Sequence, residues 1–310
     1  MITVFGSLNV DYIFQVPHLP TPGETVLASG MQVLPGGKGA NQAVAAARAG
    51  AKVCMVGAVG RDGLSEIALA GLLDVGVDTS AVAQSPKPTG TAAINVDAQG
   101  ENAITVSSGA NLDARGDSLN EENLTPRTTL LLQMEAPMTA MADLIQRARK
   151  KEACIVWNLA PMQSVDLSLL KQVDCLIVNE GELNQLHSEF RQIPKPNHYS
   201  AANVEQKAWD IFTLTGQSVV VTLGANGTLA VHNNTLLTVP ALAISPVDTV
   251  GAGDAFTGAF TAALDRGETF LVALRWGNVA GGLACLETGA QSSLPTAAQI
   301  FEHLTALPRT

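Results

Sequence analysis

Two glycines and an aspartate near the end of the chain stand where an Ala-rich helical pattern begins. Gly251 and Gly253 leave the backbone free of side chains, and Asp254 falls in the first turn of a helix expected to start near Ala252. The free N–H groups and positive dipole end of such a helix bind anions, of which phosphate fits best. A bound phosphate would repel the carboxylate of Asp254, so a functional role would explain its position. We interpret Asp254 as the base that takes a proton from an attacking hydroxyl. A simple helix cap is the alternative that these residues alone leave open.

A second glycine-rich segment, residues 35–50, also opens an Ala-rich helix. It is not a Walker loop, because Lys38 is followed by Gly39 rather than by a hydroxyl residue that could bind magnesium. The dinucleotide fingerprint fails as well, since Phe256 occupies the position of its third glycine. We therefore expect a loop that lets a ligand approach backbone N–H groups, with Asn41 supplying a donor and an acceptor. Tight packing of a helix on a strand is the alternative.

Polar residues follow several of the expected strands. Asn9 and Asp11 come just after the first strand, residues 2–5. A carboxylate such as Asp11 can accept hydrogen bonds from two neighbouring sugar hydroxyls, although an Asx turn is the simpler interpretation. Later strands are followed by Glu135, Asn179, Glu182, Thr222, Gly224 and Gly227. Because parallel strands bring their carboxyl ends to one edge of a sheet, these positions predict a single crevice there.

Strand and helix patterns alternate along most of the chain. The expected strands are 2–5, 52–57, 129–133, 154–158, 175–178 and 218–222, and the expected helices include 65–75, 140–150 and 202–214. This alternation predicts an α/β fold with a doubly wound, mostly parallel sheet and helices on both faces, formed by residues 1–310 as one domain.

Four short strand-like runs do not alternate with helices. They are 12–16 with 25–29, and 91–96 with 103–107, each pair joined through residues that favour turns. We expect them to form a small antiparallel β-sheet over 12–34 and 91–107, outside the main body, where it can act as a lid over the crevice.

Composition excludes several classes of function. The chain is 46% hydrophobic and 15% charged, which is typical of a globular protein, and its formal net charge of -10 argues against nucleic acid and anionic membranes as partners. No signal peptide or membrane span is expected. The four cysteines are far apart and form no Cys-x-x-Cys pair, so we expect reduced thiols in a cytoplasmic protein. Residues 188–200 are expected to form a surface loop.

Together these motifs resemble those of the ribokinase-like family of sugar kinases, over nearly the whole chain. The resemblance is carried, in the family's order and spacing, by Asn9, Asp11, 36–41, Glu135, Asn179, Glu182, 222–227 and 248–254. Segments 36–41 and 20–25 are most similar to the ribokinase branch. The resemblance implies transfer of phosphate from ATP to a sugar, D-ribose first, with deoxyribose, another pentose, a hexose or a nucleoside as alternatives.

The resemblance also implies a role for each matching residue. The sugar would contact Asn9, Asp11, Gly37, Lys38, Gly39, Asn41 and Glu135, while Asp254 acts as the base beside Gly251, Ala252 and Gly253. ATP would contact Asn179, Thr222, Gly224, Gly227 and Asn278, with Glu182 ordering Mg²⁺ and its waters. A potassium-type cation would bind at Asp248, Val250, Ala284, Glu287, Gly289 and Ser293. Glu287 departs from the basic residue that we expect in ribokinases.

The resemblance also implies an oligomeric state, and two other classes of function have to be weighed against it. Lid strands that pair across a dimer predict a homodimer. A nicotinamide-dependent oxidoreductase is disfavoured by the failed fingerprint, whereas a catalytically silent sugar or nucleotide sensor on the same fold stays open.

Overall fold

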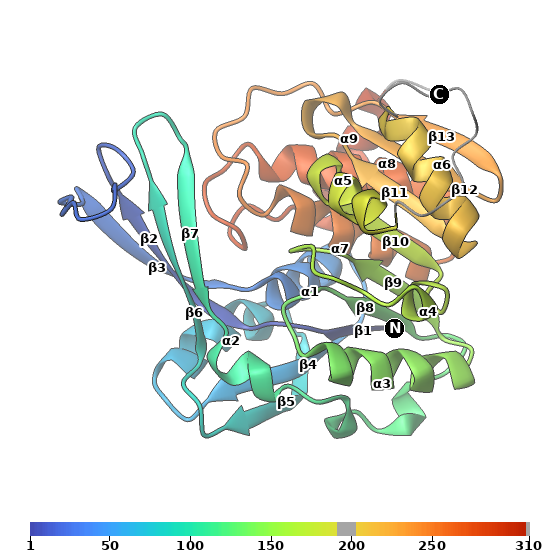
Figure 1. Ribbon diagram of the computed structural model, residues 1–310, viewed down its shortest axis with the longest axis horizontal. Coiled ribbons are helices and arrows are strands. Elements are labelled where there is room, and N and C mark those ends of the chain that lie inside the picture. The colour runs from blue at the N-terminus through green and yellow to red at the C-terminus, as the bar shows by residue number, and fades with distance from the viewer. Residues whose placement is uncertain (191–202, 308–310) are drawn as a thin grey trace.

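The computed structural model describes residues 1–190 and 203–307, and within them a large sheet forms the centre of the molecule (Figure 1). Its nine strands lie in the order β13-β12-β11-β10-β9-β8-β1-β4-β5. They are β1 (Ile2–Phe5), β4 (Val53–Gly60), β5 (Asp78–Ser85), β8 (Thr129–Leu132), β9 (Cys154–Asn158), β10 (Cys175–Asn179), β11 (Ser218–Thr222), β12 (Thr228–His232) and β13 (Thr235–Val239). The strands from β5 to β11 are parallel, and β12 and β13 extend that edge in antiparallel fashion. The expected mostly parallel sheet is confirmed.

Helices cover both faces of this sheet, as expected. They are α1 (Lys38–Arg48), α2 (Leu64–Asp74), α3 (Met138–Lys150), α4 (Leu167–Leu170), α5 (Glu180–Glu189), α6 (Val204–Thr215), α7 (Ala252–Asp265), α8 (Phe270–Ala284) and α9 (Ala297–His303). One core joins the sheet to α1, α2, α7 and α8, and a second core joins its other face to α3, α5 and α6. Because both faces are covered, the central strands are continuous apolar runs: every residue of β1, β4 and β8 is buried.

Helices α1 and α7 approach each other closely, and this contact positions the candidate site. A Cβ atom on Gly258 of α7 would lie 2.4 Å from the Cβ of Ala45 and 2.7 Å from the carbonyl oxygen of Gln42. At the start of α1, a Cβ on Gly39 would lie 2.5 Å from the amide nitrogen of Ser7, just after β1. The two glycines therefore let the first turns of α1 and α7 meet beside the end of β1.

A smaller sheet projects from this body as an arm (Figure 1). Its order is β3-β2-β6-β7, with β2 (Asn9–Gln15), β3 (Gly30–Gly36), β6 (Gly90–Val96) and β7 (Asn102–Ser107). The expectation of a wholly antiparallel sheet was wrong in one respect, because β2 and β6 pair in parallel between two antiparallel pairs. Both strands leave the main sheet's edge in the same direction, and local hairpin signals carry no information on that pairing.

The expected strand at 25–29 was also wrong. Residues 25–28 have no regular structure, and β3 begins at Gly30, paired with Gln15, and ends at Gly36, paired with Asn9. Pro35 is accommodated because β3 is an edge strand. The pairing register with β2, rather than local β propensity, decides where this strand lies.

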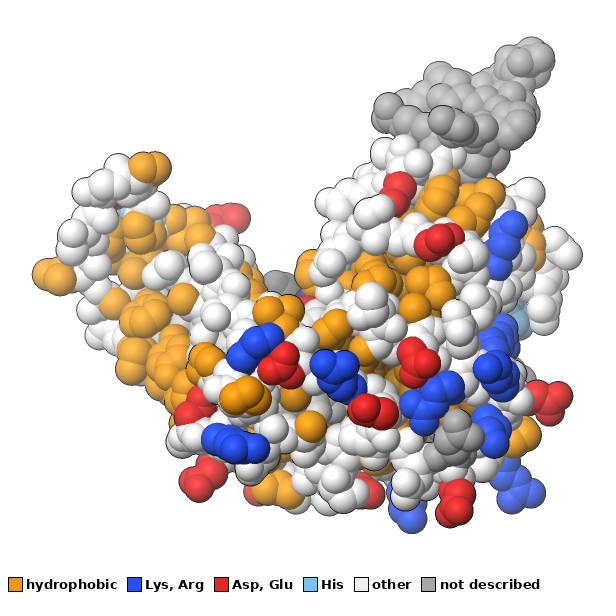
Figure 2. All heavy atoms as spheres, turned by 60° about the horizontal axis from the view of Figure 1, so that its bottom comes forward, with side chains coloured by type: hydrophobic (Ala, Val, Ile, Leu, Met, Phe, Trp, Pro, Cys, Tyr) orange, Lys and Arg blue, Asp and Glu red, His pale blue; other side chains and the backbone are white. Residues whose placement is uncertain are grey.

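The arm and the body are separated by a hollow, and hydrophobic side chains gather on the arm (Figure 2). Large hydrophobic side chains exposed on its strands and in its connecting loop are Leu27, Met31, Ile104 and Val106. Among the described residues, no helix is long and apolar enough to cross a membrane. The expected surface loop at 188–200 lies outside the described residues from position 191 onward; residues 188–189 end α5.

Candidate active site

Asp254 lies in the first turn of α7 and lines a cavity of the body. The helix begins at Ala252, and Gly251 precedes it in the left-handed region with φ 78°, where no side chain caps the helix end. A Cβ on Gly251 would lie 3.0 Å from the Cα of Ala290, so glycine suits this position for two reasons. The Asp254 side chain is 8% exposed. The expected helix start, with its glycines and carboxylate, is therefore present.

Both oxygens of Asp254 accept hydrogen bonds from the first turns of α1. Asn41 donates from Nδ2 to Oδ2 over 3.0 Å, and Gln42 donates from Nε2 to Oδ1 over 2.9 Å. The close contact of α1 with α7 brings these groups together across more than 200 residues of chain. Asn41, which we expected to contact the sugar, thus bonds directly to the candidate base.

Three further charged residues surround this carboxylate. Lys38 begins α1, and Glu135 follows β8. Asp11 lies in β2, and its carboxylate packs against Gly36. Burial, Glu135 and Asp254 together raise the pKa of Asp11 to about 6, although Lys38 opposes the shift. Burial alone would lower the pKa of Lys38, but four nearby acids together outweigh it and raise the pKa, which keeps the ammonium charged; they are Asp254, Glu135, Glu182 and Asp11.

Hydrogen bonds to neighbouring residues hold Glu135 and Asn9 in place. Glu135 Oε2 accepts from the amide of Lys38 over 3.0 Å and from the hydroxyl of Ser7 over 2.5 Å. Asn9 is 3% exposed, and its Oδ1 accepts from Nδ2 of Asn111 over 2.7 Å. The expected set Asn9, Asp11, Gly37, Lys38, Gly39, Asn41, Glu135 and Asp254 therefore meets at the junction of arm and body.

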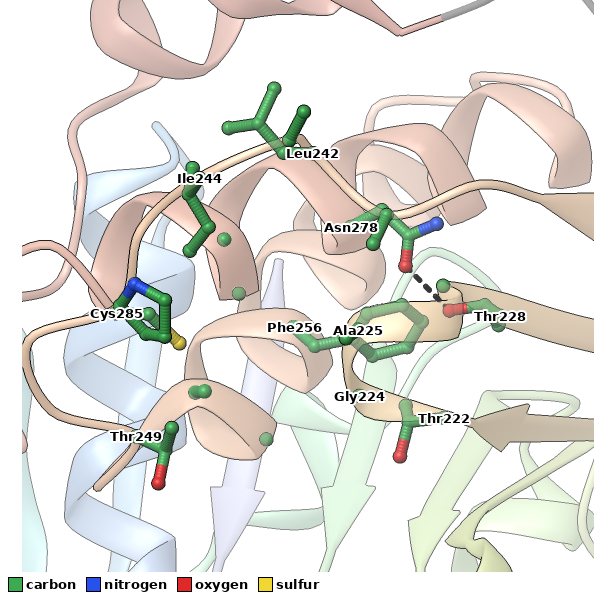
Figure 3. Close-up of a pocket in the computed structure, with 18 residues that line it drawn as sticks. Thr222, Gly224, Ala225, Thr228, Leu242, Ile244, Thr249, Phe256, Asn278 and Cys285 are labelled. Atoms are coloured by element: carbon green, nitrogen blue, oxygen red, sulfur yellow. Dashed lines mark hydrogen bonds between the residues drawn. The ribbon is translucent and has the colours of Figure 1, made fainter. Parts of the chain in front are cut away.

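Two adjoining cavities lie on the body side of Asp254. The smaller, of about 140 Å³, is lined by Lys38, Asn158, Asn179, Glu182, Thr222, Gly251, Gly253, Asp254 and neighbouring residues. The larger, of about 390 Å³, is lined mostly by apolar groups and includes Thr222, Gly224, Gly227, Gly253, Phe256 and Asn278. Figure 3 shows the larger cavity enclosed by residues of β11, α7, α8 and the segment after β13. Thr222 and Gly253 line both cavities, so the two cavities are adjacent, and Asp254 lines the smaller one.

The residues expected to bind a nucleotide line these two cavities. The side chains of Asn179, Glu182 and Asn278, however, form hydrogen bonds within the protein. Asn179 and Glu182 form a capping box at the start of α5, in which each side chain accepts from the other's backbone N–H. Asn278 donates to the carbonyls of Val239 and Pro240 and accepts from Thr228 (Figure 3). Its amide is thus engaged in holding the end of β13 against α8, so it shapes the cavity wall.

Residues of the expected cation site lie just behind Gly251. Asp248 accepts from the amide of Val250 through Oδ1 and from that of Gly289 through Oδ2, each over 3.0 Å. Ser293 donates to the carbonyl of Gly289 over 2.6 Å. Ala284 is buried at the end of α8, whereas the side chain of Glu287 is exposed. The structure therefore brings the segments of Asp248 and Gly289 together. The side chain of Glu287, where a basic residue was expected, is exposed and forms no part of these contacts.

Comparison with known proteins agrees with this geometry. The sequence pattern described as pfkB family carbohydrate kinase matches residues 1–297. The chain belongs to this family. A ribokinase of Haemophilus influenzae is 34% identical, and a deoxyribokinase of Salmonella typhi is 31% identical, each match covering 98% of both chains. The solved structure of Arabidopsis thaliana ribokinase complexed with ribose and ATP is 28% identical, covers 98% of both chains and has a TM-score of 0.86.

As a carbohydrate kinase, the protein is a phosphotransferase that acts on an alcohol group. Its geometry suits that reaction, because phosphoryl transfer depends on alignment and on neutralising the charge of the transferred group. The first turn of α7 and the ammonium of Lys38 supply positive charge in the smaller cavity, and the carboxylate of Asp254 lines the same space.

Sequence reasoning missed several residues of the kinase that the structure adds to the site. They are Ser7, Gln42, Asn111, Gln133, Asn158 and Gln291. Ser7 follows β1 directly and satisfies the rule that identified Asn9, so that signal was available. Gln291 had no local signal, because only tertiary packing brings its loop to α1.

Proposed function

We propose that this kinase transfers the γ-phosphoryl group of ATP to the primary 5-hydroxyl of D-ribose. One observation carries the proposal: a buried carboxylate at an uncapped helix N-terminus lines, together with Lys38, a cavity that adjoins a larger apolar cavity. The full-length likeness to a ribokinase supports ribose as acceptor. The likeness to a deoxyribokinase makes 2-deoxyribose the principal competitor.

In this proposal the sugar binds between arm and body and ATP binds along the two cavities. Asp11 and Glu135 accept bonds from sugar hydroxyls, and Asp254 removes the proton of the hydroxyl that attacks the γ-phosphate. The backbone of 251–253 and the dipole of α7 receive the transferred phosphoryl group. The apolar larger cavity, with Phe256 and the Gly224–Gly227 turn in its wall, takes the adenine.

Mg²⁺ belongs to this proposal as the partner of the ATP phosphates. Among the described residues, no group of three or more His, Cys, Asp or Glu side chains could hold a metal ion. That is compatible with Mg²⁺, which kinase, ATPase and polymerase sites bind through one or two carboxylates, several waters and the phosphates themselves. Glu182 is suitable, because it lines the smaller cavity and its carboxylate can accept hydrogen bonds from waters bound to the ion. When bound, the ion neutralises phosphate charge.

A monovalent cation such as K⁺ is proposed at the segments joined by Asp248. After accepting two backbone N–H bonds, its carboxylate keeps lone pairs that a cation can use. Backbone carbonyls of Val250, Ala284, Glu287 and Gly289, with the hydroxyl of Ser293, are the other candidates. The exposed side chain of Glu287 does not interfere if only its carbonyl participates.

A homodimer through the arm and a cytoplasmic location complete the proposal. The exposed side chains of Met31, Ile104 and Val106 offer apolar area that a second copy of the arm would cover. All four cysteines are free thiols, and ATP is a cytoplasmic phosphate donor. Sedimentation of the Ile104→Lys variant should show monomers where the unchanged protein forms dimers; a monomeric unchanged protein would refute the dimer.

The substrate is tested with a panel of acceptors in a coupled assay of ATP consumption. D-ribose, 2-deoxyribose, a hexose and a nucleoside are compared at equal concentration, and the product is identified by mass spectrometry. Ribose should give the highest kcat/KM and a ribose phosphate as product. Efficient phosphorylation of another acceptor without ribose phosphate would refute the ribose assignment, and ATP binding without any transfer would indicate the silent sensor.

A further inference from the structure

The carboxylate of Asp254 is the end point of two chains of buried amides. Asn41 and Gln42 each donate to one of its oxygens, over 3.0 and 2.9 Å. Behind them, Gln291 donates from Nε2 to Oδ1 of Asn41 over 3.0 Å, and Gln133 donates from Nε2 to Oε1 of Gln42 over 2.7 Å. The four amide residues are between 0% and 6% exposed, so water does not replace these bonds. Each oxygen of the carboxylate keeps lone-pair capacity for an incoming hydroxyl.

The direction of these hydrogen bonds follows from the charge at their end. An ionised carboxylate only accepts, so Asn41 must turn its NH₂ group toward Asp254 and its oxygen toward Gln291. Gln291 must then present its own NH₂ group to Asn41. Without that donor, only the contact with Asp254 orients the Asn41 amide and the oxygen of Asn41 loses its partner, so the flipped orientation, which places oxygen against oxygen at Asp254, becomes less unfavourable.

The opposite end of Gln291 supports the view that Asn41 dictates its orientation. Its Oε1 is buried and has no hydrogen-bond partner among the described residues. It packs against Gly71 of α2, where a Cβ would lie only 1.9 Å from Oε1. A buried acceptor without a partner is costly. The hydrogen bond to Asn41 therefore holds the Gln291 amide in this orientation even though its oxygen is left without a partner.

We propose that Gln291 is a positioning residue for phosphoryl transfer, which holds Asn41 in the orientation that aligns the Asp254 carboxylate. The proposal rests on the proposed role of Asp254 as base. Gln291 lies between Gly289 and Ser293, in the loop that Asp248 joins to the segment before α7. It therefore connects that loop to the reacting carboxylate through two hydrogen bonds, by a route separate from the backbone of 249–253.

Replacement by methionine tests the donor, because Gln291→Met keeps the length and approximate volume of the side chain. Small misplacements of a reacting group cost up to about 10²-fold in rate, so we expect kcat to fall by roughly 10- to 100-fold. KM for ATP should stay near its original value, because Gln291 lines neither nucleotide cavity. An unchanged kcat would overturn the proposal.

A double-mutant cycle separates positioning from a general structural role. If Gln291 acts through Asp254, Gln291→Met should cause no further loss of residual kcat in an Asp254→Asn background, because effects within one unit are not additive. An equal fractional loss in both backgrounds would overturn the proposal. Near-normal turnover of Asp254→Asn alone would instead refute the assignment of the base, so the two failures are distinguishable.

Gly71→Ala provides a variant that leaves every side chain of the site intact. Its Cβ would displace the amide of Gln291, while alanine in α2 favours the helix, so folding is preserved. We expect kcat to fall with an unchanged or higher melting temperature. Gly63→Ala is the matched control, since Gly63 caps the same helix and no atom lies within 4 Å of its Cβ position. Equal kcat in both variants would overturn the proposal.

Discussion

At the scale of single residues, the neighbours of each acid decide what it can do. Asp254 is held on both oxygens by amide donors that carry no charge, and each oxygen keeps a lone pair that can accept a hydrogen bond from a hydroxyl. Asp11 lies among Glu135, Asp254 and Lys38, and the two acids raise its pKa to about 6 together with burial. The same type of side chain therefore accepts from neutral amides at one position and is a pH-dependent group at the other.

Asp254→Asn should lower kcat by about 10²–10⁴-fold, the usual cost of losing a general base. The amide keeps the shape of the side chain, so sugar and ATP affinities should change little by calorimetry. Asn at this position can still be bonded by Gln42 or Asn41, although one donor then faces an NH₂ group. Turnover close to that of the unchanged enzyme would assign the base elsewhere.

The raised pKa of Asp11 predicts opposite effects of pH on stability and on sugar binding. Between about pH 4 and pH 6 the folded protein binds a proton that the unfolded chain releases, so this group's contribution to stability is lost as pH rises through that window. Above about pH 6 the ionised carboxylate of Asp11 continues to destabilise the folded protein. Asp11→Asn should therefore stabilise the sugar-free protein at pH 7, on the order of 1–3 kcal/mol, measured by denaturant unfolding.

Sugar affinity should move the other way. An ionised Asp11 accepts from hydroxyls more strongly than a protonated one, so KM for sugar should rise as pH falls below about 6. KM for ATP serves as the internal control. Asp11→Asn should bind sugar weakly at every pH, and its KM for sugar should no longer depend on pH. If the variant's KM still rises below about pH 6, another group is responsible for the titration.

At the scale of elements, the site depends on how closely α1 meets α7. The Ala-rich face of α1 and Gly258 of α7 leave no room for a larger side chain between the helices. Asn41 and Gln42 can then reach Asp254, although they are more than 200 residues away in sequence. The conformation of each helix is local, but the distance between them is a property of the pair.

Gly258→Ala should push these helices apart. Its Cβ would lie 2.4 Å from Ala45 Cβ and 2.8 Å from the amide nitrogen of Ala46, and overpacking of this kind costs about 1–3 kcal/mol. Both the melting temperature and kcat should fall, the latter because Asn41 and Gln42 retreat from Asp254. Gly63→Ala is the control, and unchanged values for Gly258→Ala would show that the contact is not needed.

At the scale of the whole molecule, the site lies where three separate parts of the fold meet. The arm brings Asp11, the start of α1 brings Asn41, and the loop near Gly289 closes the site from behind α7. The arm can exclude water that would otherwise hydrolyse ATP. The loop joined by Asp248 packs against Gly251, at the helix start proposed to receive the phosphoryl group, so we expect its effect to be mainly on turnover.

Potassium should therefore raise kcat more than it changes KM for sugar. A cation at Asp248 would neutralise its charge and hold the backbone of 251–253 in the geometry that the γ-phosphate needs. Initial rates are compared in potassium and tetramethylammonium salts at equal ionic strength, which removes general screening. Equal rates in the two salts would remove the proposed cation site, since Asp248 already joins the two segments through Val250 and Gly289.

The sequence by itself determined the layered α/β architecture and most of the residues that gather at the site. Apolar runs of four to eight residues and alternating helical patterns are local signals, because burial on both faces imposes them on each strand separately. The helix start at Gly251–Asp254 and the polar strand ends at Asn9, Asn179 and Thr222 could be identified for the same reason.

Only the tertiary structure decided how these parts fit together. The parallel pairing of β2 with β6 and the position of β3 depend on partners far along the chain, so local propensity at 25–29 was misleading. The amides of Gln42, Gln133 and Gln291 show the same limit: their spacing in sequence carries no periodic or motif signal. A hydrogen bond needs its donor and acceptor within about 3 Å, and only the packing of α1 against α7, the end of β8 and the loop near Gly289 sets those distances.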